Sequence, residues 1–169
     1  MPEFQQAVTN RDLDYVHELY TEYMHWVHLN LSKEYGIDFD VEEKVAQDMT
    51  ELGMFMPPDG RLTLVTLESE LVGLGCLRRI GEEVAEIKRM YLRPNFRGRG
   101  IGRELLEYLV EEAKLLGHKT IRLDSARFMD VAHSLYRSFG FKDIEPYSES
   151  EIPEEIREHW VFMEKNVPD

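Results

Sequence analysis

The chain has 169 residues and a formal net charge of −13, with 43% apolar and 31% charged residues. This length and balance predict one soluble, globular domain over residues 1–169, with enough chain for a substantial core. The acidic charge argues against nucleic acid as a partner, because binding phosphates requires a basic face.

Apolar residues recur with strand and helix periods along the chain. A short strand at residues 4–8 leads into a helix that Thr9 or Asn10 can cap and that Gly36 ends. The next expected elements are a helix at 41–52, strands at 62–67, 71–77 and 84–92, a helix at 101–116, a strand at 119–124, a helix at 130–138 and a last antiparallel pair that closes with 159–164. The order is β-α-α-β-β-β-α-β-α-β-β. It predicts an α/β (α+β) fold with a mixed, mainly antiparallel sheet and helices on both faces.

Membrane and export signals are not expected. No apolar run approaches the roughly 20 residues that span a bilayer, and the amino terminus lacks the basic flank and apolar stretch of a signal peptide. The one cysteine, Cys76, excludes an internal disulfide and suits a reducing compartment. We therefore expect a cytoplasmic protein without a membrane partner, and a buried, inert Cys76.

The most informative segment is the run Arg-Gly-Arg-Gly-Ile-Gly-Arg at residues 97–103. It follows a β-like segment and opens into a helical pattern. Glycines let the backbone approach a ligand closely, and the first turn of a helix presents unpaired N–H groups, so this segment predicts a pyrophosphate site. A Walker A loop is excluded because no Lys-Ser or Lys-Thr follows, and the dinucleotide fingerprint fails because its third glycine is displaced.

Three motifs together resemble the GNAT superfamily of N-acetyltransferases. Arg97, Gly100 and Gly102 fit the R-x-x-G-x-G pyrophosphate loop. Residues 85–94 resemble the fourth strand of that superfamily, and residues 132–141 resemble its A-x-x-L-Y-x-x-x-G-F signature, with matching order and spacing over about 57 residues. The resemblance implies the GNAT fold, in which the fourth and fifth strands splay apart, and acetyl-CoA as cosubstrate with no metal.

The resemblance also implies which residues hold the coenzyme. Backbone N–H groups of the loop should cradle the pyrophosphate, and the backbone of the fourth strand should bond the pantetheine arm and face the acetyl oxygen. The expected residues are Met90, Tyr91, Leu92, Arg97, Gly98, Arg99, Gly100, Ile101, Gly102 and Arg103. Met129 stands where many members have an asparagine that bonds the pantetheine, and a thioether cannot donate that bond.

Two catalytic residues are expected from the same resemblance. Glu86 matches the glutamate base of the histone-acetylating branch, although four residues of strand separate it from Met90 by about 13 Å. The alternative is a strand carboxylate that is paired with Lys88 or Arg89 or is simply solvated. Tyr136 occupies the tyrosine that faces the coenzyme sulfur and is the candidate acid, with packing in the helix stripe as the alternative.

The function predicted is an acetyl-CoA-dependent N-acetyltransferase, a cytoplasmic acyltransferase in which the primary amine of a small molecule attacks directly in a ternary complex. A peptide amine and a longer acyl chain are secondary alternatives, and a non-catalytic acyl-CoA-binding sensor or regulatory module is the alternative from another class. The histidines His25 and His28, with Glu22, are interpreted as helix-surface residues and not as a metal face. Domains of this kind often dimerise, which leaves a homodimer open.

Overall fold

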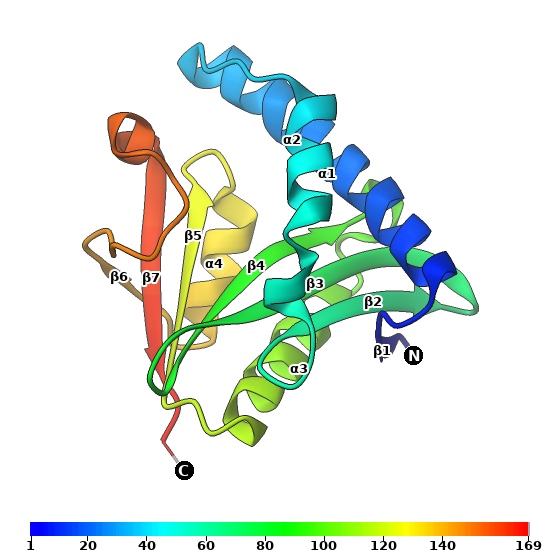
Figure 1. The fold of residues 1–169 in the computed structure, drawn as a ribbon. Helices are drawn as coiled ribbons and strands as arrows, with labels where there is room; N and C mark the ends of the chain where they lie inside the picture. Colours follow the sequence, from blue (N-terminus) through cyan, green and yellow to red (C-terminus); the bar gives the residue numbers. More distant parts are fainter. Residues whose placement is uncertain (169) are drawn as a thin grey trace.

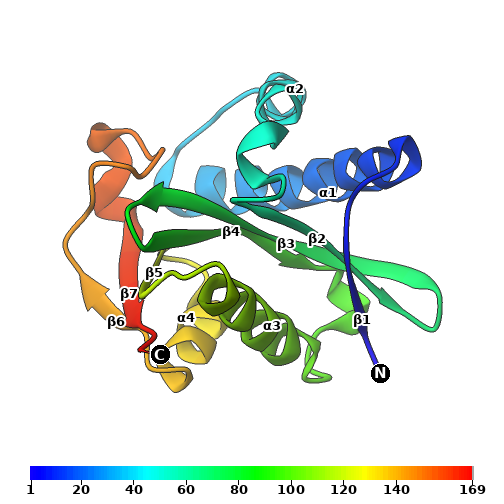
Figure 2. The ribbon, with the colours of Figure 1, turned by 60° about the horizontal axis from the view of Figure 1, so that its bottom comes forward.

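A computed structural model of the chain describes residues 1–168. Its core is a seven-stranded sheet in the order β1-β2-β3-β4-β5-β7-β6, in which β4 and β5 are parallel and the other neighbours are antiparallel. The α1 and α2 helices cover one face, and α3 and α4 cover the other (Figures 1 and 2). The predicted element order and fold class are confirmed.

The strands are β1 (Glu3–Gln6), β2 (Arg61–Leu67), β3 (Glu70–Gly81), β4 (Val84–Leu92), β5 (Thr120–Ala126), β6 (Lys142–Ile144) and β7 (Trp160–Asn166). The helices are α1 (Asn10–Tyr35), α2 (Val41–Thr50), α3 (Ile101–Leu115) and α4 (Asp130–Ser138), with short 3-10 turns η1 (Leu52–Phe55), η2 (Pro94–Phe96) and η3 (Glu154–His159).

The element boundaries differ from the expected ones where pairing or turn geometry decides them. The β3 strand continues to Gly81 because its hairpin with β4 pairs Gly81 with Val84. The β5 strand runs to Ala126 because β7 pairs with it along its whole length. The α2 helix ends at Thr50 and gives way to η1, so the expected helix end at residue 52 is wrong.

The α1 helix, which carries aromatic residues to the site, is fixed at both ends by local chemistry. Thr9 and Asp12 form a reciprocal capping box, in which each side chain accepts from the other residue's backbone N–H at 3.1 and 3.0 Å. Gly36 ends the helix in the left-handed region at φ 66°. The expected cap and break are confirmed.

The β4 and β5 strands pair over only three positions. Val84, Ala85 and Glu86 face Thr120, Ile121 and Arg122, and the ladder then stops although both strands continue. One extra residue in β4 makes a bulge opposite Gly75, where Arg89 takes φ 53°. The gap between β4 and β5 begins after Glu86, where their pairing ends, and the bulge bends β4 further away from β5.

The β3 strand holds the bent β4 strand by close backbone contact. A Cβ atom at Gly73 would lie 2.3 Å from the carbonyl oxygen of Tyr91. Glycine is therefore required where the two strands pass, since any side chain would push them apart. This contact keeps the last residues of β4 in the sheet after their partner strand has left on the other side.

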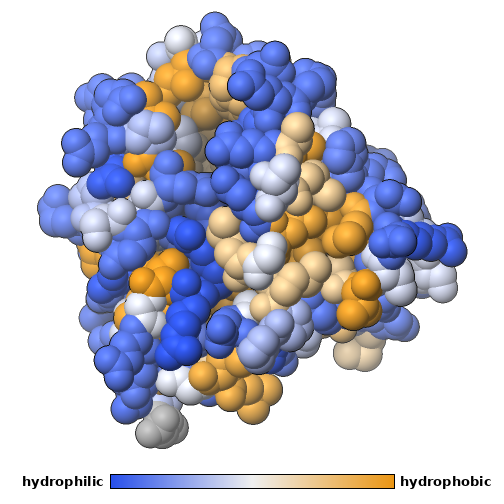
Figure 3. All heavy atoms as spheres, in the orientation of Figure 1, coloured by the Kyte–Doolittle hydropathy of each residue, from blue (hydrophilic) through white to orange (hydrophobic). Residues whose placement is uncertain are grey.

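No helix within residues 1–168 is long and apolar enough to cross a membrane. In the orientation of Figure 1, hydrophilic side chains cover most of the visible face, and apolar side chains gather over η1 (Figure 3). The cytoplasmic location stays a prediction.

The Cys76 thiol is fully buried in β3, with its Sγ 3.6 Å from the hydroxyl of Tyr20. Burial is the main cause that raises the pKa of Cys76 to about 12, because it disfavours the thiolate. The thiol therefore has neither the charge state nor the access that a nucleophile needs.

We expect Cys76 to resist labelling by the thiol reagent DTNB in the folded protein at about pH 8, because both access and thiolate are lacking. One thiol per chain should react at once in guanidinium chloride. Absorbance of the released thionitrobenzoate measures both. Rapid labelling of the folded chain would contradict this prediction.

Candidate active site

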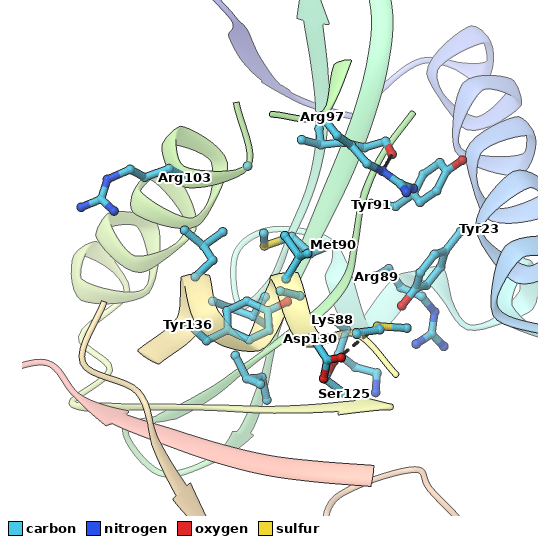
Figure 4. A pocket seen from close by; sticks show the side chains of 18 of the residues that line it. Tyr23, Lys88, Arg89, Met90, Tyr91, Arg97, Arg103, Ser125, Asp130 and Tyr136 are labelled. Atoms are coloured by element: carbon cyan, nitrogen blue, oxygen red, sulfur yellow. Dashed lines mark hydrogen bonds between the residues drawn. The ribbon is translucent and has the colours of Figure 1, made fainter. Parts of the chain in front are cut away.

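A cleft of about 640 Å³ opens where β4 and β5 part. Its walls come from β4, β5, the start of α3, the first turns of α4 and the middle of α1 (Figure 4). It contains most of the residues that the sequence motifs single out.

One end of the cleft is built to bind an anion. Gly98 and Gly100 take φ 76° and 85°, which places the loop in the left-handed conformation before α3. The first intrahelical bond runs from Glu104 N–H to the Gly100 carbonyl at 3.1 Å, so the N–H groups of residues 101–103 have no helical acceptor. These free donors and the positive end of the helix dipole favour a phosphate group.

The arginines around this loop take different positions. Arg97 and Arg103 line the cleft, whereas Arg99 lies over the ring of Phe96 at 5.3 Å. The Nε–H of Arg97 donates to the carbonyl of Leu92 at 2.9 Å, and its guanidinium stacks over Trp26 at 4.9 Å. Arg97 therefore ties the loop both to the end of β4 and to α1.

Most of the residues expected at the coenzyme do line the cleft. They are Met90, Tyr91, Leu92, Arg97, Gly98, Gly100, Gly102 and Arg103. Ile101 is 3% exposed and packs in the core. Ile101 and Arg99 can therefore contribute through the backbone, which is the role that an anion-binding loop requires. Their part in binding stays a prediction.

Tyr136 lies in α4 and is 7% exposed. Its hydroxyl points toward the middle of the cleft (Figure 4). Burial, with smaller contributions from Tyr23 and Asp124, holds the pKa of Tyr136 well above its usual value. The phenol therefore remains protonated and able to donate at neutral pH.

Met129 precedes α4 and also lines the cleft. Its sulfur accepts a hydrogen bond from the Ser125 hydroxyl at 3.4 Å, and that hydroxyl is 3.0 Å from Nε2 of the buried His133. Burial lowers the pKa of His133, because it disfavours the charged ring. These two hydrogen bonds join β5 to the start of α4 at Met129, the position where many family members have an asparagine.

Glu86 lies behind the cleft and is not among its lining residues. It is fully buried, and its two oxygens are held by Arg78 Nε at 2.7 Å and by the Tyr147 hydroxyl at 2.6 Å. Lys88 Nζ lies farther away, at 3.7 Å from Oε1. The carboxylate is therefore paired, as the alternative interpretation expected, but its main partner is Arg78 and Lys88 is only a more distant one.

Asp124 is the carboxylate that sequence reasoning missed. It lies on β5 beyond the last pairing with β4 and lines the cleft beside Ser125. It accepts from the Ser150 hydroxyl at 2.9 Å, and Lys88 Nζ is 3.8 Å away. A carboxylate near the end of the fifth strand, at the place where the strands were expected to part, is the signal that could have identified it.

Aromatic side chains form the wall of the cleft on the α1 side. Tyr23 lies 5.4 Å from Tyr91, and Trp26 meets Phe128 edge-on at 5.3 Å between ring centroids. Burial raises the pKa of Tyr23 to about 12. This wall is mainly aromatic, and Tyr23 and Tyr91 each add a phenol to it.

The helix histidines do not form a common centre. His25 approaches Glu42 at 3.6 Å and His28 approaches Asp38 at 3.0 Å, both near the surface. No group of three or more histidine, cysteine, aspartate or glutamate residues within residues 1–168 is arranged to hold a metal ion.

Comparison with known proteins gives a family. A model of the acetyltransferase (GNAT) family matches residues 13–141. The chain belongs to the GNAT family.

Similar proteins carry related names. An uncharacterized N-acetyltransferase of Schizosaccharomyces pombe is 33% identical over 149 residues, which cover 85% of this chain and 84% of that protein. The N-acetylaspartate synthetase of Xenopus tropicalis is 32% identical over 100 residues, 57% of this chain and 37% of that protein. The crystal structure of the PaiA N-acetyltransferase of Thermoplasma acidophilum in complex with coenzyme A superposes with a TM-score of 0.74 at 23% identity, over 99% of each chain, which shows a shared fold.

We expect Gly100→Glu to lower coenzyme A affinity by about a hundredfold or more, because it places a negative charge at the anion-binding end of this GNAT cleft. The control is Gly117→Glu, at the other end of α3. Gly117 has nearly the same φ of 84°, and neither glycine has an atom within 4 Å of an added Cβ. The two substitutions thus place glutamate at a similar positive φ and in open space, and they differ in their distance from the anion-binding loop. Isothermal titration with coenzyme A measures both, and equal affinities for the two variants would place the pyrophosphate elsewhere.

Proposed function

We propose that the protein transfers an acetyl group from acetyl-CoA to the primary amine of a small molecule, by direct attack in a ternary complex. The observation that carries this proposal is the junction of two features in one cleft: free N–H groups at the start of α3, and the gap between β4 and β5 with Tyr136 at its side. Family membership and the names of the relatives support the acetyltransferase class.

The donor end of the cleft fits acetyl-CoA. The loop offers unpaired N–H groups and two cleft-lining arginines to a diphosphate, and the parted strands offer backbone groups of Met90, Tyr91 and Leu92 to a narrow pantetheine arm. When bound, acetyl-CoA supplies the acetyl group as a thioester. In our proposal, N–H groups at the β4 bulge stabilise the negative charge that develops on the acetyl oxygen.

Proton movement needs a donor for the thiolate and an acceptor for the ammonium. Tyr136, which burial keeps protonated, takes the first role in our proposal. For the second role the sequence named Glu86, and this stays a prediction. Asp124 is the better-placed proton acceptor, because it lines the cleft. Glu86 does not line the cleft: Arg78 and Tyr147 enclose it, and the cleft-lining Lys88 lies 3.7 Å from it.

The acceptor is a small amine in this proposal, with a peptide amine as the alternative. The aromatic wall limits the space in the cleft on the α1 side, where we place the acceptor. One relative is named N-acetylaspartate synthetase, and N-acetylaspartate is an acetylated small amine. The enclosed Glu86 is the observation that favours a non-catalytic acyl-CoA sensor as the second candidate. Release of free coenzyme A thiol with a panel of amines separates the two, since a sensor binds the coenzyme and releases none. A homodimer stays a prediction.

We expect Tyr136→Phe to lower turnover by about 10²-fold or more while the affinity for acetyl-CoA stays within about twofold, because the ring remains and only the donor is lost. The control is Tyr108→Phe on α3, whose ring stacks on Phe4 outside the cleft. Thiol release gives turnover, and titration calorimetry gives affinity. Unchanged turnover would remove Tyr136 from the chemistry.

Asp124→Asn and Glu86→Gln test the proton acceptor against each other. We expect Asp124→Asn to reduce kcat/KM by about 10²-fold with little change in melting temperature. Glu86→Gln should instead lower the melting temperature, because it removes the buried charge that pairs with the partly buried Arg78, and should change kcat per folded molecule only a few-fold. A large loss of kcat/KM in Glu86→Gln with little loss in Asp124→Asn would instead assign the role of base to Glu86.

A further inference from the structure

Two cations lie buried at the inner end of the cleft. Lys88 and Arg89 immediately precede Met90 on β4, line the cleft, and have side chains only 3% and 9% exposed. Figure 4 shows both side chains projecting from β4 toward the side of the cleft where Tyr23 lies. Buried cations are costly unless anions face them, so their partners decide what this region can bind.

Three of the carboxylates around these cations belong to fixed elements. Asp48 on α2 contacts Arg89 Nη2 at 3.2 Å, and Glu86 on β4 and Asp124 on β5 lie 3.7 and 3.8 Å from Lys88 Nζ. Their side chains are 2%, 0% and 8% exposed. Each lies on a helix or strand and is almost fully enclosed, so none has a direct path into solvent.

The fourth carboxylate, Glu151, comes from a segment without regular structure. We call residues 145–153, between β6 and η3, the strap (Figure 1, orange). Glu151 Oε1 contacts both Lys88 Nζ at 3.0 Å and Arg89 Nη1 at 2.8 Å, and its side chain is 27% exposed. It is therefore the one partner, within residues 1–168, that can turn into solvent.

The strap stays in place by contacts other than those of Glu151. Tyr147 donates to Glu86 at 2.6 Å, Ser150 donates to Asp124 at 2.9 Å, and Arg78 Nη2 donates to the carbonyl of Glu149 at 2.8 Å. Departure of the Glu151 side chain would break none of these bonds. The strap can thus remain closed over the site while that one carboxylate is exchanged.

The seat that Glu151 occupies has the chemistry of a carboxylate site. Burial would raise the pKa of the Glu151 carboxyl, but the charges of Arg89 and Lys88 outweigh it and hold that pKa well below its usual range. One oxygen serves both cations, and the buried Nε–H of Arg89 has no acceptor among the described residues. A free carboxylate could use both oxygens on the guanidinium, which is the stronger arrangement.

A carboxylate that lines the cleft, Asp124, lies next to the position of Glu151. Asp124 lines the cleft 3.8 Å from Lys88 Nζ, on the side of the parted strands. A carboxylate bound by Lys88 and Arg89 and an ammonium facing Asp124 would thus occupy neighbouring positions. An α-amino acid carries these two charges on adjacent carbon atoms.

We propose that Lys88 and Arg89 form the carboxylate subsite of the acceptor, that Glu151 holds this subsite until the acceptor arrives, and that the acceptor is therefore an amine that also bears a carboxylate, such as an amino acid. This inference rests on the proposed function for the amine and goes beyond it in naming the acceptor's second group. Glu151 returns to solvent when the acceptor carboxylate binds.

The first test compares acceptors that differ only in the carboxylate. At saturating acetyl-CoA, thiol release is measured with hydrophobic and acidic amino acids, each beside its amide and its decarboxylated amine, for example L-phenylalanine, L-phenylalaninamide and 2-phenylethylamine. We expect at least about a tenfold higher kcat/KM for the amino acid in the preferred series. Equal or better turnover of the partners that lack the carboxylate, in every series, would overturn the inference and leave the acetyltransferase function standing.

The second test uses variants of the subsite. Glu151→Gln should lower KM for the preferred amino acid several-fold, because it removes the competing carboxylate, and leave KM for acetyl-CoA unchanged. Lys88→Met should lower the ratio of kcat/KM for the preferred amino acid to kcat/KM for its decarboxylated amine at least about tenfold; the ratio is the readout because Lys88 also lies 3.8 Å from Asp124, so that both acceptors lose some activity. Arg79→Gln, at an exposed arginine outside the cleft, is the control. Loss with both acceptors alike would mean a structural role and overturn the subsite.

The third test does not depend on turnover. Trp26 lines the cleft, so its fluorescence should report binding of carboxylates that lack the amine, such as 3-phenylpropionate and succinate, and Glu151→Gln should tighten it. If no amine is acetylated, the proposed function fails while this titration still decides the subsite. Absence of carboxylate binding to both the wild type and Glu151→Gln would overturn it.

Discussion

The parting of β4 from β5 after Glu86 is the feature on which the site depends. A parallel pair that breaks after three positions leaves backbone groups of both strands without sheet partners, a state that proteins avoid unless something else binds there. The bulge at Arg89 and the close passage of Gly73 under Tyr91 hold β4 in its bent course. The α3 helix starts a few residues beyond the end of β4, so its free N–H groups open onto the gap.

The same geometry explains how charge is distributed in an acidic protein. With a net charge of −13, the chain nevertheless brings Arg97 and Arg103 to one end of the cleft and Lys88 and Arg89 to the other. Long-range attraction draws cations toward the surface, while our proposals place anions at two points of the cleft. The two points differ in kind: backbone amides and a helix dipole at the outer end, and buried, paired side chains at the inner end.

Sequence patterns predicted the fold, the glycine loop and the inward position of Tyr136, because each of these depends on residues that are close together in the sequence. Glycines at fixed spacing permit the left-handed turns of the loop, and an amphipathic stripe determines which face of α4 turns inward. The environment of Glu86 could not be predicted in this way. Its partners, Arg78 and Tyr147, come from β3 and from the strap, and the side on which its carboxylate is enclosed depends on long-range register. Asp124 was missed for the same reason, since only the exact point at which the strands part decides whether β5 presents it to the cleft.

The β5 wall of the cleft depends on β7, so it can form only after β7 is present. Having left β4, β5 is held by β7, which pairs with it from Thr120 to Ala126. Because β7 is among the last elements of the chain to be synthesised, the second wall of the cleft cannot take its place until nearly the whole domain has been made. A ligand that needs both walls therefore cannot guide the folding of the earlier segments and can only lock a sheet that is already complete.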